Sequence, residues 1–233
     1  MMSIQYELES ELTSRGADVI RFVDISQLSG DQNREYPTAI LIGMILSKDF
    51  IKQVSSTPHY VRDLIRDHGM ADDAFSLKEK QTDRLADFIA EYLVSKGFSA
   101  YSQSEEHLEK AGVYDPEAKQ TPLPHKTIAG MAGLGWIGKH DLLVTPEYGS
   151  AISMCTVLTD VPLRTILHEP SESRCGDCRV CVDICPVNAI TGNAWSTGAS
   201  RDDLVDVSRC TTCLECMVHC PWTQAYVNGS MIR

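Results

Sequence analysis

The stretch CGDCRVCVDICP, residues 175–186, decides how the C-terminal part of this chain must fold. Its four cysteines follow the spacing C-x2-C-x2-C-x3-C, and a proline comes directly after the last of them. The same spacing returns in CTTCLECMVHCP, residues 210–221. Eight of the nine cysteines in this chain of 233 residues therefore belong to one internal repeat.

The repeated spacing is the one by which bacterial two-cluster ferredoxins bind two 4Fe–4S clusters. Three thiolates at intervals of two residues lie on one tight loop around a face of a cubane, and the proline stops that loop from continuing. In those ferredoxins the fourth cysteine of each run ligates the other cluster. We therefore expect one cluster on Cys175, Cys178, Cys181 and Cys220, and a second on Cys210, Cys213, Cys216 and Cys185.

Two other uses of clustered cysteines fit this pattern less well. Structural zinc uses cysteines in C-x2-C pairs, and a disulfide framework is typical of secreted proteins. The N-terminal segment MMSIQYELESELTS is charged and lacks the apolar core of a signal peptide. The ninth cysteine, Cys155, lies outside the repeat. It is either a buried core residue or a thiol that faces a cofactor pocket.

The composition is that of a globular protein, with 43% hydrophobic and 23% charged residues. The formal net charge is −11, and an acidic surface repels phosphate backbones, so nucleic acid is not an expected partner. The longest apolar run, AILIGMIL at 39–46, is too short to span a bilayer. We expect a soluble, cytoplasmic protein that does not bind membranes.

Residues before the repeat show alternating helix and strand patterns. The expected elements are helices ending at Gly16 and covering 78–96, strands at 17–25, 38–46 and 98–102, a surface loop at 103–123, a helix within KTIAGMAGL, and a hairpin of 141–145 with 151–159. Near residue 165 the composition changes to cysteine, proline and short polar segments. We predict an α/β domain over 1–165 and a small α+β ferredoxin-like module over 166–233.

The segment GLGWIGKH, residues 133–140, has glycines spaced like those of a nucleotide-binding loop. That loop needs a strand before the first glycine and a helix after the last, whereas here a helical pattern precedes and the extended DLLVT follows. A Walker A loop needs Ser or Thr after its lysine, and this chain has His140. We expect the glycines to let the backbone approach a large ligand or a neighbouring strand.

The block AGLGWIGKHDLLVTPEYGSAISMCTVLTDVPL, residues 132–163, followed by the cysteine repeat and CPWTQ, resembles the epoxyqueuosine reductases, which are related to the reductive dehalogenases. The resemblance implies a cobalamin beside two 4Fe–4S clusters, in an α/β domain like that of nitroreductases. It also implies a corrinoid pocket that includes Lys126, Gly133, Gly135, Trp136, Gly138, Lys139, His140 and Cys155.

The sequence departs from that family at two places. The family has an acidic proton donor shortly before the AGLGWIGK block, where this chain has KQTPLPHKT with Lys119. His125 and Asp115 are the remaining candidates for proton donation, although His125 and Lys126 could also be solvated residues at a helix start. The family continues into a helical-repeat domain that helps to hold tRNA, whereas this sequence stops at Arg233, so a tRNA substrate is not expected.

These observations predict an iron–sulfur oxidoreductase. Electrons from a small donor, such as a ferredoxin or flavodoxin, would pass through two clusters to a corrinoid that reduces an unknown small-molecule substrate. Two alternatives stay open: a ferredoxin-type electron-transfer protein, and a protein that reduces a corrinoid for another enzyme. Bound cobalt separates the electron carrier from the other two, and substrate turnover separates those two from each other.

Overall fold

A computed structural model describes residues 3–69 and 73–230, and it divides the chain into two compact units. Unit 1 takes in Met1–Met44, Lys78–Ala132 and Ser153–Glu169, and unit 2 takes in Ile45–Leu77, Gly133–Ile152 and Pro170–Arg233. The last change of unit lies near the boundary predicted at residue 165. Two earlier segments, 45–77 and 133–152, nevertheless group with the cysteine-rich part. Their composition is ordinary, so a boundary inferred from composition does not reveal them.

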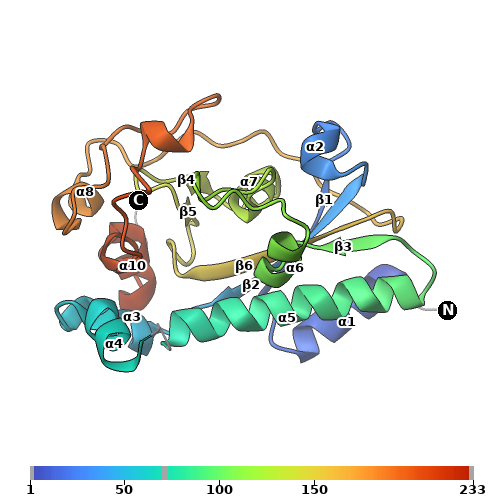
Figure 1. Ribbon diagram of the computed structural model, residues 1–233, viewed down its shortest axis with the longest axis horizontal. Coiled ribbons are helices and arrows are strands. Elements are labelled where there is room, and N and C mark those ends of the chain that lie inside the picture. The colour runs from blue at the N-terminus through green and yellow to red at the C-terminus, as the bar shows by residue number, and fades with distance from the viewer. Residues whose placement is uncertain (1–2, 70–72, 231–233) are drawn as a thin grey trace. The chain divides into compact units, whose positions relative to one another are not determined.

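Unit 1 is built on a four-stranded sheet in the order β1-β2-β6-β3 (Figure 1). The pairs β1 with β2 and β3 with β6 are antiparallel. The strands are β1 Val19–Asp24, β2 Thr38–Ile45, β3 Ala100–Ser102 and β6 Ile152–Thr159. Nearly every residue of β2 and β6 is buried, as expected for strands covered on both faces.

Helices of unit 1 complete its core. Leu8 and Leu12 of α1 and Ile89 and Leu93 of α5 are fully buried in one cluster that also contains Ile40 of the sheet. The helices that contribute to this unit are α1 Ile4–Ser14, α2 Gly30–Asn33, α5 Ala74–Ser95, α6 Glu105–Lys110 and α7 His125–Met131. The predicted positions of α1, α5, α7 and the strands β1, β2 and β3 are confirmed.

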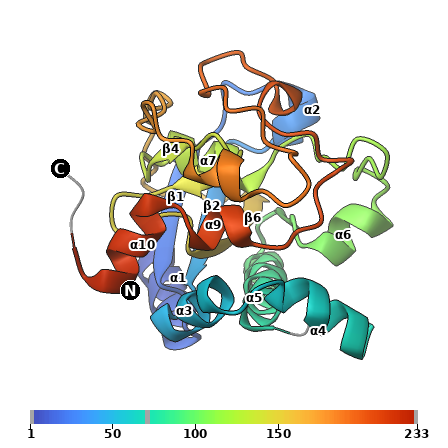
Figure 2. The same cartoon turned by 90° about the vertical axis from the view of Figure 1, so that its left-hand side faces the viewer.

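Unit 2 joins the cysteine repeat to two earlier segments. Phe50, Ile51 and Val54 pack in one buried cluster with Met217 and Val218, and Figure 2 shows α3, α9 and α10 lying together. The elements are α3 Lys48–Ser56, α4 Tyr60–His68, β4 Trp136–Ile137, β5 Leu143–Val144, α8 Val180–Ile184, a 3-10 turn Arg201–Asp203, α9 Glu215–Val218 and α10 Pro221–Asn228. This shared core explains why 45–77 belongs to unit 2.

Two predicted elements differ from the structure. The expected hairpin is wrong, because β5 pairs with β4 and the strand at 152–159 enters the main sheet instead. A bridge between Thr145 and Gly149 closes the turn. The two segments do not pair beyond this bridge, because β6 belongs to the sheet of unit 1. The expected loop at 103–123 contains α6, whose first turn carries Glu105 and Glu106, and acidic residues there stabilise a helix.

None of the described helices has both the length and the apolar character needed to cross a membrane.

Candidate functional site

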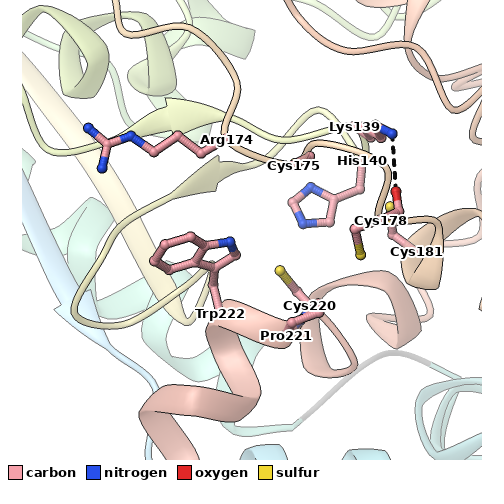
Figure 3. Close-up of a pocket in the computed structure, with 9 residues that line it drawn as sticks. All are labelled: Lys139, His140, Arg174, Cys175, Cys178, Cys181, Cys220, Pro221 and Trp222. Atoms are coloured by element: carbon pink, nitrogen blue, oxygen red, sulfur yellow. Dashed lines mark hydrogen bonds between the residues drawn. The ribbon is translucent and has the colours of Figure 1, made fainter. Parts of the chain in front are cut away.

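Four cysteines from both halves of the repeat line one cavity of unit 2 (Figure 3). The cavity has a volume of about 440 Å³ and is lined by Cys175, Cys178, Cys181 and Cys220, together with Lys139, His140, Arg174, Pro221 and Trp222. In Figure 3 the side chains of Cys178 and Cys220 extend into the same gap from different segments. The structure thus brings together the four cysteines predicted to share the first cluster.

Short helices position three cysteines of the repeat. Cys181 lies in α8, Cys216 lies in α9, and these two short helices contact each other. Cys220 is the N-cap of α10, and Pro221 occupies the first turn, where its missing N–H costs no hydrogen bond. The proline after the fourth cysteine therefore begins a helix.

Burial and nearby thiols raise the pKa values of several cysteines of the repeat. Burial raises the pKa of Cys181 to about 11, and Cys175, Cys220 and Cys178 raise it further. Burial also raises the pKa of Cys216, with contributions from Cys213, Cys210, Cys181 and Cys185. Cys181 contributes to the raised pKa of Cys216. The other thiols named here raise the pKa only of cysteines in their own predicted ligand set. Metal binding must therefore displace protons from crowded thiols.

A site for a single metal ion is a different arrangement from a cluster site. Among the described residues, no group of three His, Cys, Asp or Glu side chains is arranged to hold a single ion.

The glycines of GLGWIGKH let this segment approach β5. A Cβ on Gly135 would lie 1.9 Å from the carbonyl oxygen of Val144, and one on Gly138 would lie 2.7 Å from Cε1 of His140. Gly133 has a φ of +69°, in the left-handed region that favours glycine. Of the two explanations offered by the sequence, the structure supports close approach to a neighbouring strand.

Two other residues of this segment, Lys139 and His140, line the cysteine cavity. Nζ of Lys139 donates hydrogen bonds to the carbonyl oxygens of Gly176, at 2.8 Å, and Cys178, at 3.1 Å. His140 lines the cavity and accepts a hydrogen bond at Nδ1 from the backbone N–H of Leu142. Trp136 is 2% exposed and meets Trp222 edge to face, with ring centroids 4.8 Å apart.

Sequence reasoning missed Arg174 and Trp222 as residues of this cavity. Trp222 lies two residues after Cys220, within the CPWTQ segment, and that position was the available signal. Arg174 comes directly before the first cysteine, and its Cζ lies 5.4 Å from the centroid of the Trp136 ring. The corrinoid contacts assigned to GLGWIGKH stay a prediction, because the strand pairing, hydrogen bonds and ring contacts of this segment described above all lie within unit 2.

A second pocket lies in unit 1 and contains His125. Its volume is about 280 Å³, and its lining is Glu79, Thr82, Asp83, Gln103, Glu105, Leu108, Glu109, Tyr114, Thr121, His125 and Met154. Thr156 donates its hydroxyl hydrogen to Oε1 of Gln103, and its oxygen lies 2.9 Å from Nδ1 of His125. Since that hydroxyl hydrogen is already used, Nδ1 carries the proton and Nε2 of the neutral ring does not.

Cys155 lies behind this pocket and does not line it. Burial raises the pKa of Cys155 well above its usual range, and the nearby Asp83 carboxylate, which the thiol contacts, raises it further. Burial also raises the pKa of Asp83. The fully buried Cys155 belongs to the unit 1 core, which supports the first of its two predicted roles.

The other candidate residues of unit 1 lie at different places. Asp115 is exposed, and its carboxylate accepts hydrogen bonds from the backbone N–H groups of Glu117 and Ala118, so it shapes a turn. Lys126 follows His125 on α7 and is half-buried. Neither of them lines the described pocket, and their catalytic and cofactor roles stay predictions.

We expect stability to fall in acid because of His125. Burial lowers its pKa from the usual 6.5 to about 4, so between these values the unfolded chain binds a proton that the folded chain does not. Stability is therefore lost as the pH falls through this window, by about 2 kcal/mol between about pH 7 and pH 5. Urea unfolding of the His125→Asn variant should show a smaller loss than the parent. Equal losses would contradict this assignment.

The cysteine-rich part of the chain matches a known protein family. Residues 174–224 match the family described as the 4Fe-4S dicluster domain, and all eight cysteines of the repeat lie within this range. The predicted two-cluster module is confirmed by this match.

Curated proteins similar to this chain include epoxyqueuosine reductases. A stretch is 31% identical over 144 residues to epoxyqueuosine reductase of Vibrio cholerae, covering 52% of this chain and 36% of that enzyme. The Escherichia coli enzyme is 29% identical over 172 residues, covering 67% of this chain and 41% of that enzyme. The resemblance to epoxyqueuosine reductases is confirmed. The chain matches well under half the length of these curated relatives.

Solved structures show the same fold. The epoxyqueuosine reductase of Streptococcus thermophilus has a TM-score of 0.56 at 18% identity, over 96% of this chain and 67% of that chain. A catabolic reductive dehalogenase has a TM-score of 0.62 at 19% identity, over 93% and 31%. The mixed α/β class with a C-terminal ferredoxin-like module is thereby confirmed.

The exclusion of nucleic acid is wrong. One epoxyqueuosine reductase with this fold was solved with an epoxyqueuosine-modified stem loop of tyrosine tRNA, at a TM-score of 0.55. The net charge of −11 is a sum over the whole chain, whereas recognition of a nucleotide depends on a few local contacts. The small-molecule substrate inferred together with that exclusion loses its support as well.

Proposed function

We propose that this chain is an iron–sulfur reductase of the epoxyqueuosine reductase type, and that its substrate is an epoxyqueuosine nucleoside in RNA. The observation that carries this proposal is that four repeat cysteines line one cavity together with Lys139 and His140 of the GLGWIGKH segment. The curated relatives support the reaction class, and the structure with a tRNA stem loop supports the substrate class.

The cysteine cavity suits an iron–sulfur cluster. Its four thiols come from both cysteine runs, as in two-cluster ferredoxins, and Lys139 fixes the loop of the first run by its two hydrogen bonds. When bound, such clusters pass one electron at a time. Trp136 is buried in edge-to-face contact with Trp222, which lines the cavity, and such apolar rings limit access of water.

Cobalamin is proposed from the relatives rather than from a cavity. One neighbour of the same fold is a reductive dehalogenase described in terms of B12-dependent dehalogenation. The unit 1 pocket, at about 280 Å³, is smaller than most ligand sites and does not enclose a whole corrinoid. We therefore derive no step through this cofactor. The nitroreductase-like character of unit 1 and a cytoplasmic location belong to the same proposal.

The unit 1 pocket supplies proton-carrying groups. Removing an epoxide oxygen consumes two electrons and two protons, forms a carbon–carbon double bond and releases water. Asp83 has a raised pKa and can hold a proton, whereas His125, whose pKa burial lowers to about 4, is neutral near pH 7 and can donate only its Nδ1 proton. Sequence reasoning missed Asp83, because it is one of many acidic residues in an ordinary helix pattern. Asp115 stays the weaker candidate, since its carboxylate is used in a turn.

The proposal predicts turnover of one defined substrate. Protein purified without oxygen, reconstituted with iron and sulfide, supplied with cobalamin and reduced with titanium(III) citrate is incubated with a stem loop containing epoxyqueuosine. Mass spectrometry of the digested nucleosides should show the loss of one oxygen atom. The matched control is the Cys175→Ala variant under the same conditions. Full iron and cobalt loading without conversion would show that the proposed substrate is wrong.

A further inference from the structure

We propose that Lys139 is a positioning residue for the cluster in the cavity of Figure 3, and that its charge raises the reduction potential of that cluster. The inference rests on one part of the proposed function, namely that the four cysteines of this cavity hold a 4Fe–4S cluster. It does not depend on cobalamin or on the identity of the substrate.

Lys139 reaches from the segment after β4 to the first cysteine loop. Its Nζ donates to the carbonyl oxygens of Gly176 and Cys178, at 2.8 and 3.1 Å, and Figure 3 shows it beside Cys178 and Cys181. One of these carbonyls belongs to a predicted ligand, and the other follows Cys175 directly in the chain. The ammonium therefore fixes the path of the loop that supplies Cys175 and Cys178 and leads into α8, which supplies Cys181.

The burial of this lysine points to a negative group nearby. Only 7% of Lys139 is exposed, and a buried charge is costly unless an opposite charge compensates it. In the part of the chain that the structure describes, its ammonium meets two neutral carbonyl oxygens and no carboxylate. A cluster held by the four thiolates that line the same cavity would be negatively charged and would supply the missing counter-charge.

The effect on the potential follows from Coulomb's law. The reduced cluster carries one more negative charge than the oxidised cluster, so a nearby cation stabilises the reduced form more. Net charge and hydrogen bonding around a cluster are the main determinants of its potential. Lys139 supplies the charge directly, and its two hydrogen bonds keep that charge at a fixed place on the loop.

Arg174 provides a matched control, because it is a second cation on the wall of the same cavity. Its guanidinium lies over the Trp136 ring, and Figure 3 shows it directed away from the cysteines. Arg174→Gln removes one positive charge from the wall, but it leaves the two hydrogen bonds of Lys139 in place.

The test measures potentials and iron content, with no substrate present. Lys139→Met, Lys139→Arg and Arg174→Gln are reconstituted without oxygen, and their reduction is followed by electron paramagnetic resonance. We expect a lower potential for one cluster in Lys139→Met, a value close to the parent in Lys139→Arg, and a smaller decrease in Arg174→Gln. An unchanged potential in Lys139→Met, or an equal decrease in Arg174→Gln, would overturn the proposal.

A further variant covers the case in which Lys139→Met loses its cluster. Lys139→Gln keeps an amide donor for the loop carbonyls but removes the charge, so a lowered potential supports the inference and an unchanged one overturns it. Failure of the proposed function can be distinguished from failure of this inference. Variants that show the expected shift in a protein that does not convert the stem loop would contradict only the substrate, and turnover without the shift would contradict only the role of Lys139.

Discussion

Replacing Cys220 with alanine is expected to reduce the iron content of the reconstituted protein from about eight to about four atoms per chain. Cys220 belongs to the second cysteine run, yet it lines the cavity formed by the first run. It is also buried, so no solvent ligand reaches its place easily. The cluster that disappears should therefore be the one held by the first run.

Two further variants decide whether the ligands are exchanged between the runs. Cys185→Ala should remove the other cluster, so the two single variants lose different signals in electron paramagnetic resonance. Cys155→Ala is the matched control, because Cys155 is a buried core residue of unit 1 and should leave the iron content unchanged. If Cys220→Ala and Cys185→Ala lost the same signal, or if Cys155→Ala lost iron, the ligand assignment would be wrong.

The local features of this chain could be predicted well from its sequence. The geometry of a cluster requires a fixed spacing of thiols. Each cysteine run can therefore be recognised within twelve residues of sequence. The strand β2 and the helix α1 follow from apolar patterns that depend only on neighbouring residues. Even the exchange of Cys220 into the first set could be expected, since the repeat implies it.

The long-range features could not be predicted, because no local pattern encodes them. The hydroxyl of Tyr226 donates to the carbonyl oxygen of Leu46, which ties 45–77 to unit 2, but neither residue has a distinctive neighbourhood in the sequence. The contact between Asp83 and Cys155 also joins two residues that are far apart in the sequence and lie in no distinctive pattern. Lys139 is part of a recognisable motif, yet only the fold shows that its partners are carbonyl groups of the cysteine loop.

A second large effect is expected from Gly135→Ala, which should destabilise the protein by about 3 kcal/mol. The added Cβ would lie 1.9 Å from the carbonyl oxygen and 2.8 Å from the carbonyl carbon of Val144. These are backbone atoms of β5, and Val144 is fully buried, so no side-chain rotation can relieve the overlap. The β4–β5 pairing must open instead, which displaces Lys139 from the cavity wall and Trp136 from its contact with Trp222.

The opposite result is expected for Gly130, which lies three residues before the GLGWIGKH segment. A Cβ on Gly130, inside α7, would meet no atom within 4 Å, and alanine favours a helix over glycine by up to about 1 kcal/mol. Urea unfolding without oxygen should therefore show a lower midpoint for Gly135→Ala and an equal or higher one for Gly130→Ala, with iron lost only from the first. Equal midpoints for the two variants would mean that the glycines of GLGWIGKH are not needed for packing against β5, and a ligand-facing role would then have to explain them.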